Sequence, residues 1–495
     1  MVLGTTSGAG KSWLATALCR WYARQGLRVA PFKAQNMSNN ARVVPAEAQP
    51  GGTSGRGGGE IGSAQYFQAL AARAEPTVRM NPLLLKPERD THSQVVLMGQ
   101  VSDELTGMPW RDRSARVWPA IAASLDALRA DHDVVVIEGA GSPAEINLHA
   151  SDIVNMRVAL HADARCLLVT DIDRGGAFAH LYGTWALLPE AERLLIRGFV
   201  LNKFRGDAAL LAPAPEMLQK LTGIPTVATL PMWWQHGLPE EDGVFDDRTA
   251  SHGGVPVHTT VAVVAYPRIS NLDEFQPLKN VPGVRLKWVR SPADLPGADW
   301  VVLPGSKHTS GDLAWLRHQG LDRAVRAHAE AGGAVLGVCG GLQMLGEAMI
   351  DPHGIDGNAP GLGLLPLVTR FEREKTVRHA RGRFGAAWAP GIPSPWARLA
   401  GVAVAGYEIH HGQTAPHAAM ARAGDLAEEL MPDGLAWRNA AGNVLGLYLH
   451  GLFEDPAALQ ALFGQQAPTL ETVFDGMADY VDRHFAPGVL RALIA

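Results

Sequence analysis

A glycine-rich segment near the start of the chain has the residues of a phosphate-binding loop. Residues Gly4–Ser12 include three glycines, then a lysine and a serine, and an apolar helical pattern follows. Glycines let backbone N–H groups turn toward a phosphate, and the positive end of the next helix adds to the attraction. We expect Gly8, Gly10 and Lys11 to bind nucleotide phosphates and the Ser12 hydroxyl to bind Mg²⁺.

Three further polar side chains follow apolar runs that resemble buried strands. Glu138 comes directly after Val134–Ile137, and we expect it to be the second Mg²⁺ partner. Lys33 ends another apolar run, where it would neutralise a phosphate or a substrate carboxylate; a solvated lysine is the alternative. Asn202 follows Gly198–Leu201 and could contact the nucleotide base. Open α/β sheets bind ligands beyond the carboxyl ends of their strands, so these positions belong to one edge.

Two polar clusters lie on loops of the same half of the chain. Asp171 and Asp173 stand beside an arginine and two glycines, directly after the apolar run Arg165–Thr170. Asn147 and Asp152 belong to the loop that follows Glu138. We expect these side chains to contact substrate, and ordinary surface-loop chemistry is the alternative.

A cysteine in the second half has the surroundings of a nucleophile. Residues 334–345 predict a strand, a sharp turn and a helix, with Cys339 at the bend. Gly340 and Gly341 allow the tight turn. A helix N-terminus lowers the pKa of a thiol, and the thiolate is the attacking form. The backbone N–H of Gly340 could also stabilise an oxyanion. A buried cysteine that only packs is the alternative.

A histidine at the end of another apolar run is the candidate base. His450 follows Val444–Leu449, and attack on an amide carbon needs such a thiol–imidazole pair. Gly305, in a Pro-Gly turn after a further apolar run, could complete the oxyanion hole with a backbone N–H. His410 and His411 are better explained as surface or packing histidines.

The elements that must position these groups alternate between strands and helices. The first half has a helical pattern at 13–25 and strand-like runs at 27–32, 134–137, 165–170, 198–201 and 225–230. A second series lies at 261–265, 284–288, 300–303, 334–338 and 444–449. Such runs indicate parallel sheets covered on both faces. The sequence predicts an α/β chain of two doubly wound domains, 1–250 and 251–495, with a linker near 246–259 and a mobile surface loop at 45–59.

Composition limits the class of protein. A chain of 495 residues is too long for one core and suits two domains. With 19% charged residues and a net charge of −5, it lacks the basic character of nucleic-acid binders. Three widely spaced cysteines indicate a reducing compartment. No apolar run has the length of a membrane span, and the phosphate loop leaves no room for a signal peptide before it. We expect a cytoplasmic enzyme with no nucleic-acid or membrane partner.

The second half resembles class I glutamine amidotransferase domains, in the subgroup fused to enzymes that amidate cobyrinic acids. Residues 337–343 match the nucleophile segment, and residues 448–453 match the histidine segment of that subgroup. The resemblance implies that Cys339 and His450 release ammonia from glutamine. Many class I domains carry a glutamate two residues after the histidine. That position is Leu452 here, which implies a Cys–His dyad rather than a triad.

The first half resembles the dethiobiotin synthetase-like branch of P-loop enzymes. Gly4 lies six residues before Gly10, a spacing that this branch shares, whereas the common motif has five. Members of the branch phosphorylate or otherwise activate carboxylates. The resemblance implies ATP and Mg²⁺ as cofactors, with Lys33, Glu138 and Asn202 at the phosphate, Mg²⁺ and base positions.

Nearly the whole chain resembles the CobB/CobQ-type glutamine amidotransferase family. Polar strings at 31–40, 59–62, 81–87, 139–147 and 171–176 match family segments, which implies a corrin substrate contacted by residues such as Asn36. Ser63 departs from the family pattern, where an arginine is more usual. The resemblance implies amidation of the b, d, e and g carboxylates of (adenosyl)cobyrinic acid a,c-diamide in adenosylcobalamin biosynthesis.

Two alternatives stay open. An enzyme of the same superfamily makes the a,c-diamide by two amidations, and the segments around Asn36 and Asn81 argue against it. The other alternative is a P-loop switch or partitioning ATPase with an inactive glutaminase-like module. Retention of Cys339 and His450 argues against that class, as does the absence of an early lysine within Thr5–Ala9.

Overall fold

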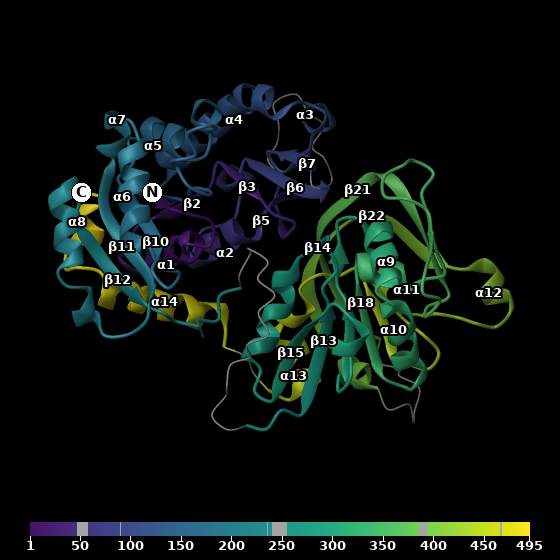
Figure 1. Ribbon diagram of the computed structural model, residues 1–495. Helices are drawn as coiled ribbons and strands as arrows, with labels where there is room; N and C mark the ends of the chain where they lie inside the picture. Colours follow the sequence, from purple (N-terminus) through teal and green to yellow (C-terminus); the bar gives the residue numbers. More distant parts are fainter. Residues whose placement is uncertain (47–57, 90, 235, 240–254, 386–393, 466–467) are drawn as a thin grey trace.

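The chain folds into two α/β lobes that lie side by side (Figure 1). The structure is a computed structural model that describes residues 1–46, 58–89, 91–234, 236–239, 255–385, 394–465 and 468–495. The predicted linker and the predicted surface loop fall mostly outside these ranges. Residues 59 and 259, at the ends of those two predicted segments, lie in strands.

The first lobe is built on a parallel sheet. The strands β1 (Val2–Gly4), β10 (Cys166–Asp171), β11 (Ile196–Phe204) and β12 (Thr226–Pro231) are neighbours in that order. The pair β2 (Val29–Phe32) and β9 (Val134–Ile137) extends the sheet, because Val2 bridges to Glu138 in parallel. All carboxyl ends therefore meet at one edge, as the sequence predicts.

Both faces of this sheet are buried, because successive side chains of a strand point to opposite faces. Leu167 packs on one face with Leu14 of helix α1 (Lys11–Arg24). Leu168, the next residue, packs on the other face with α5 (Met156–Ala162) and α6 (Ala177–Leu187). The first domain is thus doubly wound, with the phosphate loop between β1 and α1.

A smaller set of strands extends this lobe toward the second one. Strand β3 (Gln35–Met37) pairs in parallel with β6 (Leu83–Arg89), and β7 (His92–Leu97) and β8 (Gln100–Val101) continue that sheet. Strands β4 (Ala41–Val44) and β5 (Gly59–Gly62) form an antiparallel pair. The helices α2 (Ser63–Ala71) and α4 (Trp110–Asp131) complete this region. The sequence reading did not predict these short strands.

The second lobe contains a mixed sheet in the order β15-β13-β16-β18-β25-β24-β23. The strands β13 (Thr259–Val264), β15 (Val284–Val289), β16 (Trp300–Leu303), β18 (Ala334–Val338) and β25 (Val444–Leu447) are parallel. The last two strands, β24 (Ala436–Arg438) and the edge strand β23 (Glu428–Met431), pair in the antiparallel direction. The helices α9 (Thr309–His318), α10 (Leu321–Glu330) and α11 (Gly340–Leu345) belong to this lobe.

A long antiparallel hairpin of the second lobe meets the first lobe. Strands β21 (Leu367–Arg383) and β22 (Ala403–Pro416) form it, and both approach β4. At the contact, Val43 and Leu84 of the first lobe share a buried apolar cluster with Tyr407 and Ile409 of β22. The lobes therefore pack through a common core as well as through polar contacts.

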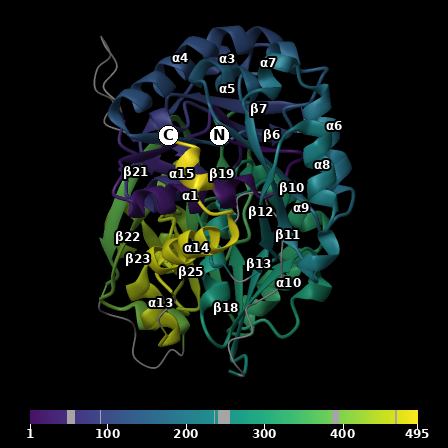
Figure 2. The ribbon, with the colours of Figure 1, turned by 90° about the vertical axis from the view of Figure 1, so that its left-hand side faces the viewer.

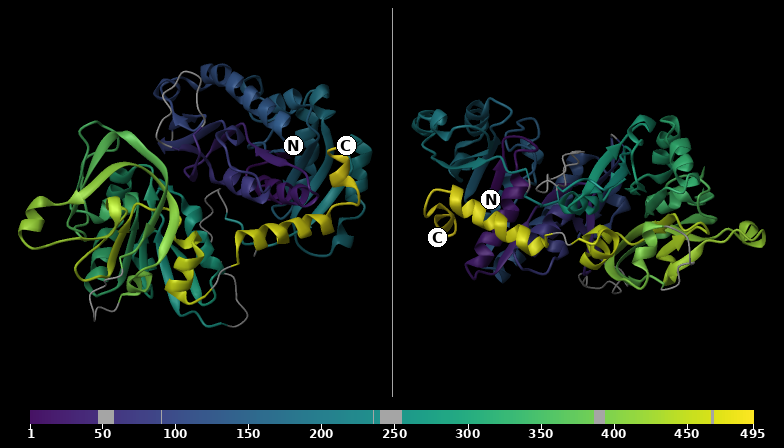
Figure 3. Two further views of the ribbon diagram at one scale, coloured as in Figure 1. Left: turned by 180° about the vertical axis from the view of Figure 1, so that it is seen from behind. Right: turned by 90° about the horizontal axis from the view of Figure 1, so that it is seen from below.

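The C-terminal segment returns to the first lobe. Helix α13 (Pro456–Phe463) belongs to the second lobe, whereas α14 (Leu470–His484) lies along α1, as the view from behind shows (Figure 3). The view rotated by 90° shows both chain ends on the first lobe (Figure 2). The range 251–495 therefore needs a correction, because the apolar face of α14 packs in the first core, around Phe474 and Met477.

Candidate functional site

The phosphate loop is shaped by close backbone approach. Gly10 has φ +97°, and a Cβ there would lie 2.0 Å from the Asn202 amide nitrogen. Asn202 donates to the Ala9 carbonyl at 2.9 Å, and Lys203 donates to the Gly8 carbonyl at 2.8 Å. The end of β11 thus supports the loop, and the predicted residue Asn202 lies against it.

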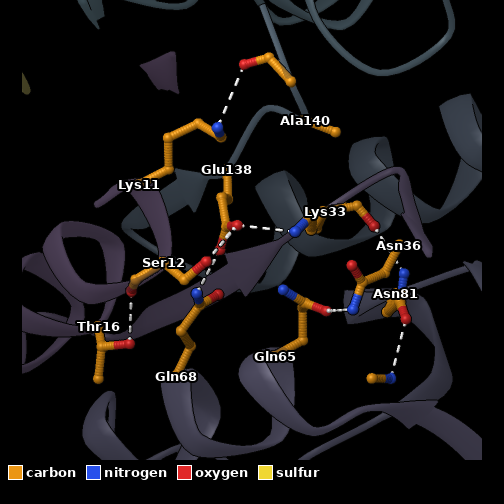
Figure 4. A network of polar contacts seen from close by, with 12 residues as sticks. Lys11, Ser12, Thr16, Lys33, Asn36, Gln65, Gln68, Asn81, Glu138 and Ala140 are labelled. Atoms are coloured by element: carbon orange, nitrogen blue, oxygen red, sulfur yellow. Dashed lines mark hydrogen bonds and ion pairs between the residues drawn. The ribbon is translucent and has the colours of Figure 1, made fainter. Parts of the chain in front are cut away.

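Glu138 is the centre of a buried polar network beside this loop (Figure 4). Its carboxylate accepts from the Ser12 hydroxyl at 2.8 Å, from Lys33 at 2.7 Å and from Gln68 at 2.6 Å. Burial raises the pKa of Glu138, but Lys33 and the donated hydrogen bonds hold that pKa below its usual value. Lys33 is buried, so the alternative of a solvated lysine is wrong. Gln68, in α2, was not predicted, because no motif in the sequence marks it.

Oxygen atoms suited to Mg²⁺ meet at this point. Ser12 and Glu138 contact each other at the carboxyl edge of the sheet, and hydroxyl and carboxylate oxygens are the ligands that Mg²⁺ prefers. Lys11 points toward the carbonyls of Thr6 and Gly141, at 3.0 and 3.2 Å. The residues expected to bind phosphate and metal therefore lie together.

The predicted substrate contacts lie in different surroundings. Asn36 is buried and donates to Gln65 at 3.2 Å, on the side of Lys33 and Glu138 (Figure 4). Asp171 pairs with Lys203 at 3.1 Å, next to the phosphate loop, and Asp173 pairs with Arg205.

The other polar loop is more structural in its contacts. Asp152 accepts three backbone N–H groups at the start of α5, from residues 154 to 156. These bonds satisfy the free donors of a helix N-terminus. Asn147 is exposed on the same loop. Asp152 therefore holds the loop, whereas the Asn147 side chain faces solvent.

Cys339 lies at a strained bend between β18 and α11. Its φ and ψ are 52° and −106°, a conformation that residues with a Cβ seldom adopt. A Cβ on Gly341 would lie 1.8 Å from the Leu303 carbonyl oxygen, so only glycine lets α11 approach β16. Strain of this kind persists only where the surrounding structure enforces it, and it clusters at active sites.

The two predicted oxyanion glycines flank this bend. Gly340 begins α11 and lies against the backbone nitrogen of Ser306, 2.8 Å from the position of a Cβ. Gly305, in β17 (Gly305–Ser306), lies near the His450 ring, at 3.2 Å from the position of a Cβ. Both turns therefore reach the reacting groups.

His450 joins Cys339 to a third residue that the sequence reading missed. Its Nδ1 lies 2.9 Å from a carboxylate oxygen of Glu274, and the other oxygen of Glu274 accepts from the Gly451 N–H at 2.9 Å. Cys339 and His450 line the same cavity, and the thiol donates to the Ile409 carbonyl at 3.5 Å. The prediction of a Cys–His dyad without a carboxylate is therefore wrong. Glu274, which comes from a different segment of the chain, contacts the His450 ring.

Glu274 could not be located from spacing. It lies in a 3₁₀ segment, Leu272–Asn280, and 176 residues separate it from His450. Burial lowers the pKa of His450, but Glu274 and the Cys339 contact raise that pKa to about 10. The imidazole is therefore held in its protonated form between a carboxylate and a thiol.

His410 and His411 are both involved in packing. His410 is buried, stacks on Tyr448 with 3.9 Å between ring centroids, and lies 3.1 Å from Glu408. Burial lowers the pKa of His411 to about 4. Both histidines also line the cavity beside Cys339, so their interpretation as surface or packing histidines stays a prediction.

A cavity of about 100 Å³ opens beside Cys339 and His450. Its walls come from both lobes, with Asn39, Lys86, Glu88 and Gln94 from the first and Lys307, Lys375 and His411 among those from the second. A larger surface groove, of about 610 Å³, lies between α2 and α14, away from both sets of reactive groups. We assign the thiol chemistry to the smaller cavity, because Cys339 and His450 line it.

The described residues contain neither a membrane-spanning helix nor a cluster of metal ligands. Within the described ranges, no helix is long and apolar enough to cross a bilayer. The three cysteines are all buried free thiols. Across the residues that the structure places, no three His, Cys, Asp or Glu side chains cluster as a metal site.

Comparison with known proteins gives the class and the family. Residues 1–238 match the CobQ/CobB/MinD/ParA nucleotide binding domain, and residues 260–458 match the CobB/CobQ-like glutamine amidotransferase domain. The cobyric acid synthase of Variovorax paradoxus is 78% identical over 495 residues, covering 100% of this chain and 99% of the relative. That of Acidovorax ebreus is 76% identical, covering 100% and 98%. That of Polaromonas naphthalenivorans is 74% identical, covering 100% and 99%.

Fold, sites and matched domains define a class, in which a nucleotide-binding domain is joined on one chain to a glutamine amidotransferase domain. Within this class, the chain belongs to the cobyric acid synthase family.

Proposed function

We propose that this chain uses ATP and glutamine to amidate the b, d, e and g carboxylates of (adenosyl)cobyrinic acid a,c-diamide, as a cytoplasmic step of adenosylcobalamin biosynthesis. The observation that carries the proposal is the presence of two complementary sites on one chain. A thiol–imidazole–carboxylate set can release ammonia, and a phosphate loop with Lys33 and Glu138 can activate a carboxylate. The chain is 78% identical to a cobyric acid synthase over its full length, which supports the choice of substrate.

The glutaminase half-reaction follows from the geometry of Cys339. Cys339 reacts as a thiolate paired with the protonated His450, and the thiolate attacks the side-chain amide carbon of glutamine. Backbone N–H groups near Gly305 and Gly340 would stabilise the oxyanion. The imidazolium then protonates the amide nitrogen, which leaves as ammonia, and water hydrolyses the glutamyl thioester. Glu274 favours the charged imidazolium throughout.

The synthetase half-reaction follows from the first site. The substrate carboxylate attacks the γ-phosphorus of ATP, which gives an acyl phosphate and ADP. Lys11 and Lys33 would neutralise the charge that passes to the leaving group. Mg²⁺, held by Ser12 and Glu138, would supply further positive charge to the phosphates. Ammonia displaces phosphate from the acyl carbon and forms the amide.

The cavity at Cys339 supports a protected path for ammonia. At neutral pH free ammonia is mostly ammonium, which is not nucleophilic, so release into solvent would waste it. Because first-lobe side chains such as Lys86 and Gln94 line the cavity, ammonia would leave Cys339 toward that lobe. For the domains, we propose 1–250 together with the C-terminal segment 470–495 as the synthetase, and the residues between as the glutaminase.

The experiment follows product mass with ATP, Mg²⁺, glutamine and adenosylcobyrinic acid a,c-diamide. We expect four successive losses of about 1 Da, one for each amidation, since replacing OH by NH₂ changes the mass by that amount. Cys339→Ala should stop the reaction with glutamine but not with ammonium salt. Two steps from cobyrinic acid, with none from its a,c-diamide, would instead indicate the a,c-diamide synthase. Absence of any mass change would refute the corrin assignment.

A further inference from the structure

A buried arginine of the first lobe reaches the catalytic histidine region of the second. Arg42, in β4, is 2% exposed and forms a close ion pair with Asp273. It also donates to both oxygens of Glu454, at 2.8 and 2.6 Å. These two carboxylates come from segments that 181 residues separate, and Arg42 is the cation between them.

Both carboxylates are next to catalytic groups along the chain. Asp273 precedes Glu274, the residue that binds the His450 ring. Glu454 lies four residues after His450, in the segment whose Gly451 N–H also binds Glu274. An arginine that fixes Asp273 and Glu454 therefore fixes both ends of the Glu274–His450 contact. Arg42 touches neither the thiol nor the cavity, so it acts through these neighbours.

An aromatic contact connects the same groups. The Tyr407 ring stacks on the His450 ring, with 5.1 Å between centroids and 15° between planes. The Arg42 guanidinium lies over the Tyr407 ring, 5.1 Å from its centroid, and over the Phe67 ring at 5.0 Å. Cation–π contacts of this kind are strongest when desolvated, as here. Arg42 thus limits the position of His450 from a second direction.

Backbone contacts align the two segments. The Ala41 N–H donates to the Asn271 side chain at 2.9 Å, and the Leu272 N–H donates to the Asn40 side chain at 3.0 Å. The Asn271 amide lies 3.4 Å from Nδ1 of His450. The segment 40–42 of the first lobe is therefore paired, residue by residue, with the segment that carries Glu274.

We propose that Arg42 is a positioning residue for the glutaminase centre, which is complete only when the first lobe is docked against the second. The inference rests on the proposed function, because it concerns the glutamine-hydrolysing half of that reaction. The first lobe, which would bind ATP and substrate, thus supplies the arginine that positions Glu274 and His450 in the second lobe.

The test compares two full-length variants, Arg42→Gln and Arg20→Gln. Arg20 is the matched control, since it is also fully buried and also bridges distant segments, through Glu471 and Asp475 of α14. Three quantities are measured for each: glutaminase kcat and KM from glutamate release, amidation with ammonium salt, and the thermal unfolding midpoint.

For Arg42→Gln we expect a glutaminase kcat at least about tenfold lower, since small misplacements of catalytic groups have effects of that size. The KM for glutamine should change by less than about threefold, and ammonium-supported amidation should stay within about twofold, because the groups that bind are untouched. Arg20→Gln should leave glutaminase kcat unchanged even where it lowers the unfolding midpoint.

A glutaminase kcat of Arg42→Gln within about twofold of the wild type would overturn the inference. An equal loss in Arg20→Gln would also overturn it, because the effect would then be one of general stability. If Arg42→Gln fails to fold, Arg42→Lys takes its place under the same criteria, since lysine keeps the charge but cannot bind two carboxylates in a fork. A wild type with neither activity would instead refute the proposed function.

Discussion

At the scale of single residues, His450 shows how its neighbours control its charge. Burial alone disfavours an imidazolium, yet the Glu274 carboxylate and the Cys339 contact raise the pKa of His450 to about 10. A pKa raised above the unfolded value of about 6.5 contributes stability that is complete below that pH and is lost as pH rises through the folded pKa. His450 therefore contributes most to the free energy of unfolding below about pH 6.5, and this contribution decreases toward pH 10.

Glu274→Gln tests the role of that carboxylate. Without it, burial dominates and the pKa of His450 falls, so the imidazolium is lost at lower pH. We expect the alkaline limb of the glutaminase kcat profile to move down by at least about one pH unit. We also expect kcat to fall by about 10- to 100-fold, because an orienting acid is removed. Glu428→Gln, at an ion pair with Arg438 on the edge strand, is the control and should change neither. An unmoved alkaline limb would contradict the assignment.

Residue types and spacing lead to predictions only for groups that lie within one motif. Lys11 and Ser12 adjoin in sequence, and Cys339 lies beside its glycines, so their assignment to a site can be argued from local chemistry alone. Glu274 could not be found in this way. Its role arises because the segment 271–274 is brought under His450 by the fold and by β4 of the other lobe. Contacts between distant segments depend on tertiary structure that a single sequence does not state.

At the scale of elements, the phosphate loop depends on one glycine. Gly10→Ala would place a methyl group 2.0 Å from the Asn202 nitrogen, in a left-handed conformation. We expect ATP affinity to fall by at least about tenfold, which corresponds to 1.4 kcal/mol and lies within the usual size of such strain.

Gly26→Ala is the matched control for this substitution. Gly26 ends the same helix with φ +82°, and no atom lies within 4 Å of its Cβ position. It should reduce stability while leaving ATP affinity unchanged. Nucleotide titration of both variants measures the difference, and equal losses would show that strain alone, rather than the contact with Asn202, is responsible.

Helix α14 belongs to the first lobe by packing, and one side chain tests this. Phe474 is 1% exposed and lies in the core that α1 and the first sheet form. We expect Phe474→Ala to lower the free energy of unfolding by about 3–5 kcal/mol, measured by chemical denaturation. Arg483→Ala, on the exposed side of the same helix, should change it by less than about 0.5 kcal/mol. A loss below about 1 kcal/mol for Phe474→Ala would contradict the packing.

The strands of both main sheets were predicted from apolar runs, because buried parallel strands are continuously apolar. Val134–Ile137 and Ala334–Val338 agree with the structure residue for residue. The hairpin β21–β22 was not predicted. Much of β21 is exposed and rich in charge, so its sequence lacks the pattern of a buried strand. Its pairing and its contact with the other lobe stabilise it instead.

At the scale of the whole molecule, the two lobes share a buried group of charges. Glu60 of the first lobe is 1% exposed and binds Lys86 at 2.7 Å and Lys375 of the second lobe at 2.5 Å. Burial raises the pKa of Glu60, but the two lysines hold that pKa well below its usual value. Its contribution to stability is present above the unfolded pKa of about 4.5 and is lost as pH falls below it.

Glu60→Gln should weaken the contact between the lobes. Two buried ammonium groups would lose their partner, so we expect a loss of about 3–5 kcal/mol in the free energy of unfolding. Denaturant titration measures it. The control is Glu104→Gln, at an exposed ion pair with Arg116 of 3.3 Å, where a change of less than about 1 kcal/mol is expected. Equal effects would show that burial at Glu60 is unimportant.

The packing of α14 in the first lobe has a consequence for folding during translation. A ribosome releases the chain from its N-terminus, so residues 473–490, which complete the first core, emerge after the strands and helices of the second lobe. The strands and helices of the second lobe are synthesised before α14. They can pack while the core of the first lobe is still incomplete. The core of the first lobe is thus begun before the second lobe is synthesised and completed after it.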